Sequence, residues 1–235
     1  MRVRNIEELQ NEIDNDVAWR KKEISELYLS FQSSNSAASM ARACFVMLCA
    51  HFEGAIRHSS NAYVTYVSEQ NVNGAELKPE IISIILRKKK HHLFNHTGQK
   101  KVKISSVLDL IKSYEEMMNV DFSVRVGNND IITGDSDFVY IPTEGNPTPE
   151  VLSEIANILC LDYESLFRLR ENYINFELLK PRHGVAHGEK RPISKDELNA
   201  ARSFVLDIVD EYTGAIMSAA TNFAYKRLSC ELQQS

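Results

Sequence analysis

The sequence lacks the features that mark secreted and membrane proteins. Its longest apolar run, residues 43–50, is far shorter than the ~20 residues that span a bilayer, and acidic, polar sequence instead of an apolar core follows residues 1–4. The four cysteines form no C-x-x-C pair and lie mainly on apolar stretches, as buried thiols do in a reducing compartment. We therefore expect a cytoplasmic protein that is neither secreted nor embedded in a membrane.

Several well-known site motifs are also missing. There is no G-x-G-x-x-G, no Walker loop, no H-E-x-x-H and no internal repeat. These absences remove the usual sequence support for a dinucleotide-binding fold, a P-loop NTPase, a zincin protease or a solenoid. No cofactor is expected.

Acidic residues are absent from residues 81–108, although the whole chain carries a formal charge of −5. Such asymmetry is typical of a face that binds a polyanion, and an inert solvated loop is the alternative. A zinc site at His91, His92 and His96 is disfavoured because no cysteine or acidic residue accompanies them. The basic residues of this segment are Arg87, Lys88, Lys89, Lys90, Lys100, Lys101 and Lys103.

Apolar residues recur at helical spacing along most of the chain, which predicts an all-α fold. At 235 residues and 43% hydrophobic content, we expect one domain over residues 1–235, with an irregular or β-hairpin insertion at about 120–147, centred on 121–141. Pro181 is expected to end or bend the helix that precedes it in the sequence, which is expected at residues 162–179. The expected helices are 5–29, 37–68, 79–86, 104–118, 148–159, 162–179 and a last helix from 195 that reaches toward 228. The expected caps are Thr148 followed by Pro149, Asp162, and a capping box from Ser194 to Glu197.

Residues 181–189 hold a guanidinium, two imidazoles and a carboxylate within nine positions. Metal-free RNA cleavage needs a base for the 2′-hydroxyl proton, an acid for the leaving 5′-oxygen and a cation for the phosphate. Histidine suits the proton transfers because its ordinary pKa is about 6.5, and arginine suits the phosphate because its planar fork stays charged. His183 and His187 would share a helix face, whereas Arg182 and His187 would lie roughly 140° apart. A helix end or bent turn at Pro181 or the nearby glycines would bring all three together.

This segment resembles the HEPN superfamily of small helical domains, whose signature is R-x4-H. Residues 178–189, Leu178 to Glu189, are similar to the "LL-x-x-RN-x-IAHGE" motif of the MAE-type (RiboL-PSP-HEPN-like) bacterial branch. Residues 50–54, Ala50 to Gly54, followed by residues 62–67, are similar to its "AHWEG" helix, and a separate region of likeness covers residues 146–162. The family usually has Asn where His183 stands, so His183 either adds a second imidazole or marks a site that has drifted.

The resemblance implies an HEPN-like helical bundle and a metal-independent endoribonuclease, a toxin or defence effector that cleaves tRNA or other cellular RNA. Attack by the 2′-hydroxyl would leave a 2′,3′-cyclic phosphate. It also implies a homodimer with the motifs facing one cleft, and a possible antitoxin or defence-system partner. Arg182 would clamp phosphate, His187 would be the general acid or base, and His183 a second proton-handling group. The supporting residues would be Glu53, His51 and Glu189.

Other interpretations remain open. Arg182, His183 and Glu189 could form an ion-pair cluster at a helix junction, and Glu53 could pair with Arg57 at i, i+4. The chain could also be a non-catalytic HEPN-like module that binds nucleotide, RNA or a protein. A metallohydrolase is disfavoured, because a zinc-binding H-x-x-x-H helix usually carries Glu directly after its first His.

Overall fold

The computed structural model of the chain describes residues 2–34, 37–89, 104–121, 141, 143 and 145–227. This part of the chain is all-α, as the sequence predicts, and its β-structure consists of two isolated bridges. The insertion expected at 121–141 lies almost wholly outside the described residues.

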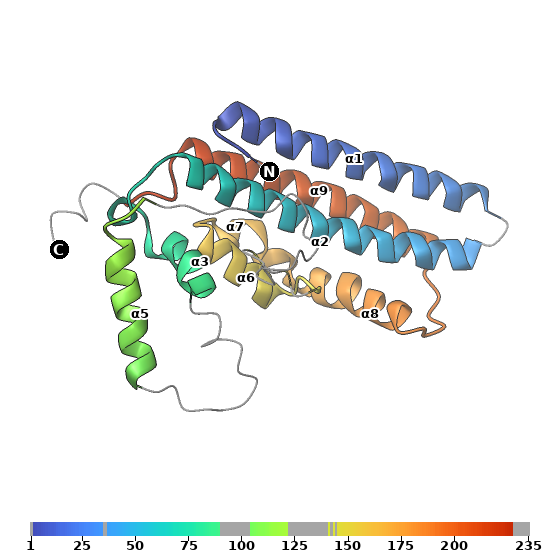
Figure 1. Cartoon of the computed structure of the whole chain (residues 1–235). Coiled ribbons are helices and arrows are strands. Elements are labelled where there is room, and N and C mark those ends of the chain that lie inside the picture. The colour runs from blue at the N-terminus through green and yellow to red at the C-terminus, as the bar shows by residue number, and fades with distance from the viewer. Residues whose placement is uncertain are drawn as a thin grey trace, which may run out of the picture.

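Three long helices form a bundle in which each helix packs against the other two (Figure 1). Helix α1 runs antiparallel to α2 and α9: Gln70, after the end of α2, donates to the carbonyl of Arg4, and Tyr28 near the end of α1 donates to Asn199 near the start of α9. The apolar stripes of the three helices therefore face one shared core. The helices are α1 (Ile6–Ser33), α2 (Ala37–Glu69) and α9 (Lys195–Thr221).

Helix α1 begins at an asparagine cap. The Asn5 side chain accepts a hydrogen bond from the Glu8 backbone N–H (2.8 Å), which satisfies one of the free donors of the first turn. The helix runs one turn beyond the expected end at residue 29, and Phe31 in this extra turn is buried.

Helix α2 is the core of the molecule, because neighbours surround it on several sides. Its most apolar 18-residue window would suffice by length and composition to cross a membrane, but 56% of that window is buried inside the structure, as in a core helix. Cys44 and Cys49 are buried in it, as predicted. Burial raises the pKa of both thiols, that of Cys49 to about 12, so they remain protonated and unreactive.

A turn at residues 71–74 leads from α2 into the 3-10 helix η1 (Gly74–Glu76) and then α3. Helix α3 spans Pro79–Lys89, three residues longer than expected, so it contains the first part of the basic segment. Helix α5 spans Ile104–Met117 and packs against α3.

The second half of the chain brings shorter helices under α2 (Figure 1). Helix α6 (Pro149–Ile158) starts as predicted, with Thr148 as its cap and Pro149 in its first turn. The single helix expected at 162–179 is wrong. Asp162 does cap a helix, but α7 ends after one turn, at Leu166. The elements that follow are the 3-10 helix η2 (Arg168–Arg170), the π-helix η3 (Tyr173–Leu179) and α8 (Lys180–Ala186).

Pro181 does not halt the helix, contrary to one expectation. In a regular α-helix its ring would clash with the carbonyl of Glu177, four residues earlier. The preceding π-helix is wound more widely, and the Lys180 N–H bonds to Asn175, five residues back. The wider turn gives the proline ring room, and the chain continues as α8.

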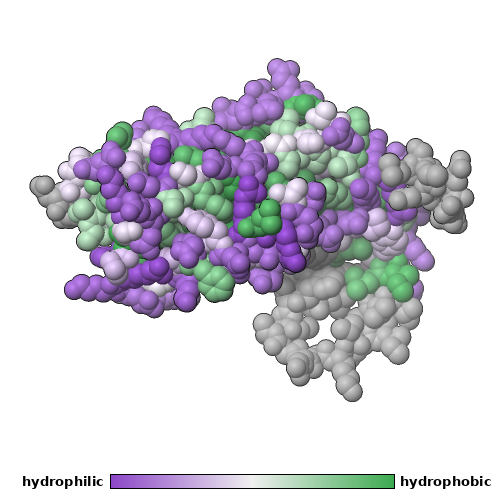
Figure 2. All heavy atoms as spheres, turned by 180° about the vertical axis from the view of Figure 1, so that it is seen from behind, coloured by the Kyte–Doolittle hydropathy of each residue, from purple (hydrophilic) through white to green (hydrophobic). Residues whose placement is uncertain are grey.

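Helix α9 begins with the predicted capping box, in which Ser194 and Glu197 each accept from the other's backbone N–H. It ends at Thr221, well before residue 228, because Phe223 adopts a left-handed conformation (φ 53°). Lys226 then bridges to Leu77 beside η1. The face of the molecule turned away in Figure 1 is mainly hydrophilic, with hydrophobic side chains in small scattered groups (Figure 2).

Candidate active site

The R-x4-H segment lies on α8 and the turn that ends it. Gly188 has φ 83°, its N–H bonds to the Val185 carbonyl (3.1 Å), and the Glu189 N–H bonds to the Gly184 carbonyl (2.9 Å). These two bonds make a Schellman ending, in which a left-handed glycine satisfies the last free carbonyls of the helix. His187 is the C-cap residue of α8, so both histidines keep regular helical spacing.

His183 and His187 form a pair on the exposed face of α8. Their ring centroids are 4.2 Å apart and the rings are tilted by 54°. Both side chains are exposed, so a substrate could reach both imidazoles at once. This is the arrangement that their four-residue spacing predicts.

Arg182 lies on a different side of α8 and is partly buried. Its Nη1 donates to the Gly145 carbonyl (2.9 Å) and to Asn146 Oδ1 (3.4 Å). Its Nη2 lies 4.0 Å from Glu53 Oε2. The expectation that a bend would gather Arg182 and both histidines within one chain is wrong, because α8 stays helical through Gly184 and keeps the arginine roughly 140° from His187.

Glu53 comes from α2 and faces Arg182. Its other carboxylate oxygen, Oε1, accepts a hydrogen bond from the Thr143 hydroxyl (2.8 Å). The Glu53 side chain is 13% exposed and that of Arg182 is 26% exposed, so the acid is the more deeply placed partner. A buried carboxylate needs such partners, because leaving its charge unpaired costs several kcal/mol.

His51 faces α1 and not Arg182, so the structure does not bring it to the residues that it was expected to support. It stands two positions before Glu53, which on a helix is roughly 200° around the axis. The ring packs edge-on against Trp19 of α1, and its Nε2 lies 3.0 Å from Glu23 Oε2 without the alignment of a hydrogen bond. Burial lowers the pKa of His51.

Glu189 is exposed, and its carboxylate folds back over Gly184. A Cβ at position 184 would lie 2.6 Å from Glu189 Oε2, so the contact needs glycine there. Within the described part of the chain, His183, His187 and Glu189 do not form a group that could hold a metal ion, and neither do any other three His, Cys, Asp or Glu residues.

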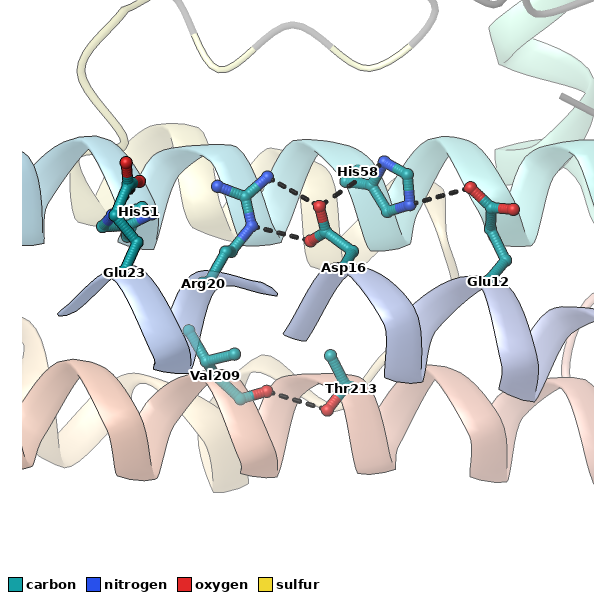
Figure 3. A network of polar contacts seen from close by, with 8 residues as sticks. All are labelled: Glu12, Asp16, Arg20, Glu23, His51, His58, Val209 and Thr213. Atoms are coloured by element: carbon teal, nitrogen blue, oxygen red, sulfur yellow. Dashed lines mark hydrogen bonds and ion pairs between the residues drawn. The ribbon is translucent and has the colours of Figure 1, made fainter. Parts of the chain in front are cut away.

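A row of charged residues between α1 and α2 was missed by the sequence reasoning (Figure 3). Arg20 forms a two-pronged ion pair with Asp16 (2.7 and 2.9 Å), and both side chains are nearly buried. His58 lies 3.2 Å from Glu12 and 3.9 Å from Asp16. The row lies on the face of α2 opposite Glu53. It therefore holds α2 against α1 and is not itself part of the candidate site.

Gly54 makes this row possible. A Cβ at position 54 would lie 2.4 Å from Nη1 of Arg20, so the guanidinium rests directly on the backbone of α2. Glycine inside a helix is unfavourable by itself, and its presence in the middle of α2 was the available signal for a close approach.

The basic segment is described only in part. Arg87, Lys88 and Lys89 lie on the last turn of α3, whereas Lys90, Lys100, Lys101 and Lys103 lie outside the described residues, as do His91, His92 and His96. The predicted polyanion-binding face therefore stays a prediction.

Comparison with known proteins identifies the family. A profile of the RiboL-PSP-HEPN family matches residues 15–218, which include Glu53, Arg182, His183 and His187. The chain belongs to the RiboL-PSP-HEPN family. No curated protein and no solved structure matches it. HEPN membership supports an RNase-type or nucleotide-binding module, and the matched range begins within α1 and ends within α9, so it contains most of the three-helix bundle.

Within this HEPN chain the two resembling blocks meet in space. The α2 block supplies Glu53 to the arginine of the α8 block, while its histidine and glycine turn to α1. The pair of Glu53 and Arg182 is therefore a direct contact between the two blocks.

Proposed function

We propose that this HEPN chain is a metal-independent endoribonuclease acting through Arg182, His183 and His187. The main support is the exposed pair of imidazoles, with ring centroids 4.2 Å apart, on the same short helix as a partly exposed guanidinium that lies on another side. Family membership supports the same class of activity.

The proposed reaction needs only groups of the substrate and this chain. One imidazole removes the proton of the RNA 2′-hydroxyl, whose oxygen attacks the adjacent phosphorus. An imidazolium protonates the 5′-oxygen as its bond to phosphorus breaks. Arg182 holds the charge on the phosphate oxygens. The products carry a 2′,3′-cyclic phosphate and a 5′-hydroxyl, and no external nucleophile is consumed.

A second copy of the chain would complete the site. Arg182 and His187 point to different sides of α8, so one copy does not direct both at one phosphate. Two copies related by a two-fold axis would bring one chain's arginine toward the other's histidines. We expect a homodimer by light scattering at working concentration, and an RNA-cleaving monomer would contradict this part of the proposal.

As a biological setting, we propose a toxin or defence effector in the cytoplasm that acts on tRNA or another cellular RNA. A partner protein, such as an antitoxin, would restrain it. Co-expression with the product of a neighbouring gene tests this: relief of growth inhibition together with co-purification is the expected outcome.

Incubation of the purified protein with total RNA in a chelator tests the proposed reaction. New ends should map to discrete sites and carry 2′,3′-cyclic phosphates and 5′-hydroxyls. The matched control is His183→Ala/His187→Ala, which removes both imidazoles from an exposed surface. Equal cleavage by this variant, or loss of activity in the chelator, would contradict the proposal.

The alternative is a non-catalytic module that binds nucleotide, RNA or a protein. It is favoured by one observation, namely that Arg182 is already engaged by Gly145 and Asn146. Binding of RNA without any new ends, at every RNA tested, would favour this alternative.

A further inference from the structure

Two arginine–carboxylate pairs that lie on opposite faces of α2 differ in the distance between their charged groups. Arg20 and Asp16 close to hydrogen-bond distance through two bonds of 2.7 and 2.9 Å. Arg182 and Glu53 remain 4.0 Å apart, although both side chains are partly buried. Oppositely charged side chains this close normally approach to hydrogen-bond distance, so other contacts must keep the second pair apart.

Three residues before α6 contact both partners of the open pair. The Thr143 hydroxyl donates to Glu53 Oε1 (2.8 Å), while the Gly145 carbonyl and Asn146 Oδ1 accept from Arg182 Nη1. We call Thr143, Gly145 and Asn146 the brace. Each charge of the pair is thus bonded to the brace instead of to the other charge.

The brace residues are also joined to one another through the backbone. The Asn146 N–H bonds to the Thr143 carbonyl (3.0 Å), which closes the turn, and Gly145 within it has φ 68°. A side chain at position 145 would be strained by that backbone angle, although the space around it is open. The Thr148 N–H then bonds to the Asn146 carbonyl (2.7 Å), and α6 begins at Pro149.

Both hydrogen bonds from the Arg182 guanidinium to the brace leave from Nη1. Among the described residues, neither Nε nor Nη2 donates a hydrogen bond, and the Glu53 carboxylate lies 4.0 Å from Nη2. The edge formed by Nε and Nη2 can bind two oxygens of one phosphate side by side.

We propose that the brace is a positioning element that keeps the Arg182–Glu53 pair open, so that the free edge of Arg182 can bind a phosphodiester of RNA. The identity of the ligand rests on the proposed function, whereas the opening of the pair does not. Thr143 acts through Glu53: without its hydroxyl, the carboxylate rotates onto Arg182 and competes with the phosphate.

A double-mutant cycle tests whether Thr143 strengthens RNA binding through Glu53. The ligand is a 2′-O-methylated single-stranded RNA, which lacks the attacking hydroxyl and so reports binding alone. Thr143→Val should weaken binding about fivefold, the most that a partly exposed ion pair usually contributes. Glu53→Gln should bind at least as tightly as the unmodified protein. Adding Thr143→Val to Glu53→Gln should then change little, because no carboxylate remains to close on Arg182.

The matched control is Thr213→Val on α9, another buried threonine, whose hydroxyl donates to the Val209 carbonyl (2.9 Å; Figure 3). It should bind RNA like the unmodified protein. Equal weakening by Thr143→Val with and without Glu53 would mean that the substitution merely damages the turn, and it would overturn the proposal. Unchanged binding in Thr143→Val would overturn it as well.

A crystal structure of the RNA-free Thr143→Val protein separates this proposal from the proposed function. The Arg182–Glu53 distance should contract from 4.0 Å to about 2.8 Å. An unchanged distance would refute the brace even if the protein cleaves RNA. Contraction in a protein that binds no RNA would keep the brace and refute the proposed ligand.

Discussion

Gly54→Ala gives the sharpest test of how α2 is held in place. The added methyl group would lie 2.4 Å from Arg20 Nη1, 2.9 Å from Cζ and 3.0 Å from Nη2, so the guanidinium must move. Arg20 is a flexible side chain, but its two bonds to Asp16 fix its position and both residues are nearly buried. Moving the guanidinium therefore disturbs the ion pair.

The magnitude follows from two opposing effects. Overpacking of a fitted contact costs about 1–3 kcal/mol. Replacing glycine by alanine inside a helix returns up to about 1 kcal/mol. The net loss in the free energy of unfolding should therefore be about 1–2 kcal/mol, measured by urea denaturation with the slope unchanged.

The chain offers a matched control for this substitution. Gly214 lies inside α9, and a Cβ built there has no atom within 4 Å. Gly214→Ala should therefore stabilise the protein by about 0.5–1 kcal/mol. In an Arg20→Met background the clash is absent, and Gly54→Ala should become stabilising as well. Equal stabilisation by both alanines in the unmodified protein would refute the reasoning.

Three further predictions concern the proposed site, the basic segment and pH. His187→Ala should lower the RNA cleavage rate ~10²–10⁴-fold while circular dichroism stays unchanged; a folded variant of full activity would exclude its catalytic role. Replacing Lys88, Lys89 and Lys90 by Ala should flatten the log–log salt dependence of RNA affinity by up to ~2 units, and an unchanged slope would mark the segment as a solvated face. His51 has a lowered pKa in the folded chain because it is buried, so the unfolded chain takes up its proton first as pH falls below 6.5. The stability present above that pH should be lost on acidification. In urea titrations, His51→Gln should reduce the slope of the free energy of unfolding against pH by up to about 1.4 kcal/mol per pH unit. An identical slope in the variant would show that His51 is not the source of this pH dependence.

Local signals predicted much of the fold. Thr148-Pro149 and the Ser194 to Glu197 capping box placed two helix starts correctly, because a cap depends on residues three or four positions apart. The ends were less predictable. Helix α9 stops at a left-handed Phe223, and no glycine marks that position in the sequence.

The site was predictable where it depends on helical spacing. The His183–His187 contact follows directly from four residues on one helix. The same rule, applied to His51 and Glu53, would have shown that they face opposite sides of α2. The brace could not be found this way, because Thr143 and Gly145 reach Glu53 and Arg182 across large sequence distances. The approach of Glu53 to Arg182 was expected from the family resemblance, while its catalytic consequence stays a prediction.

The π-helix before Pro181 affects how this chain should be aligned with its relatives. A wide turn of this kind accommodates one more residue than an α-helix does over the same length. A relative with a plain α-helix here would be one residue shorter between Tyr173, whose ring packs on Phe204, and Arg182. An alignment without a gap would then keep the motif in register but shift every residue before it, and it would assign wrong partners to the aromatic contacts with α9.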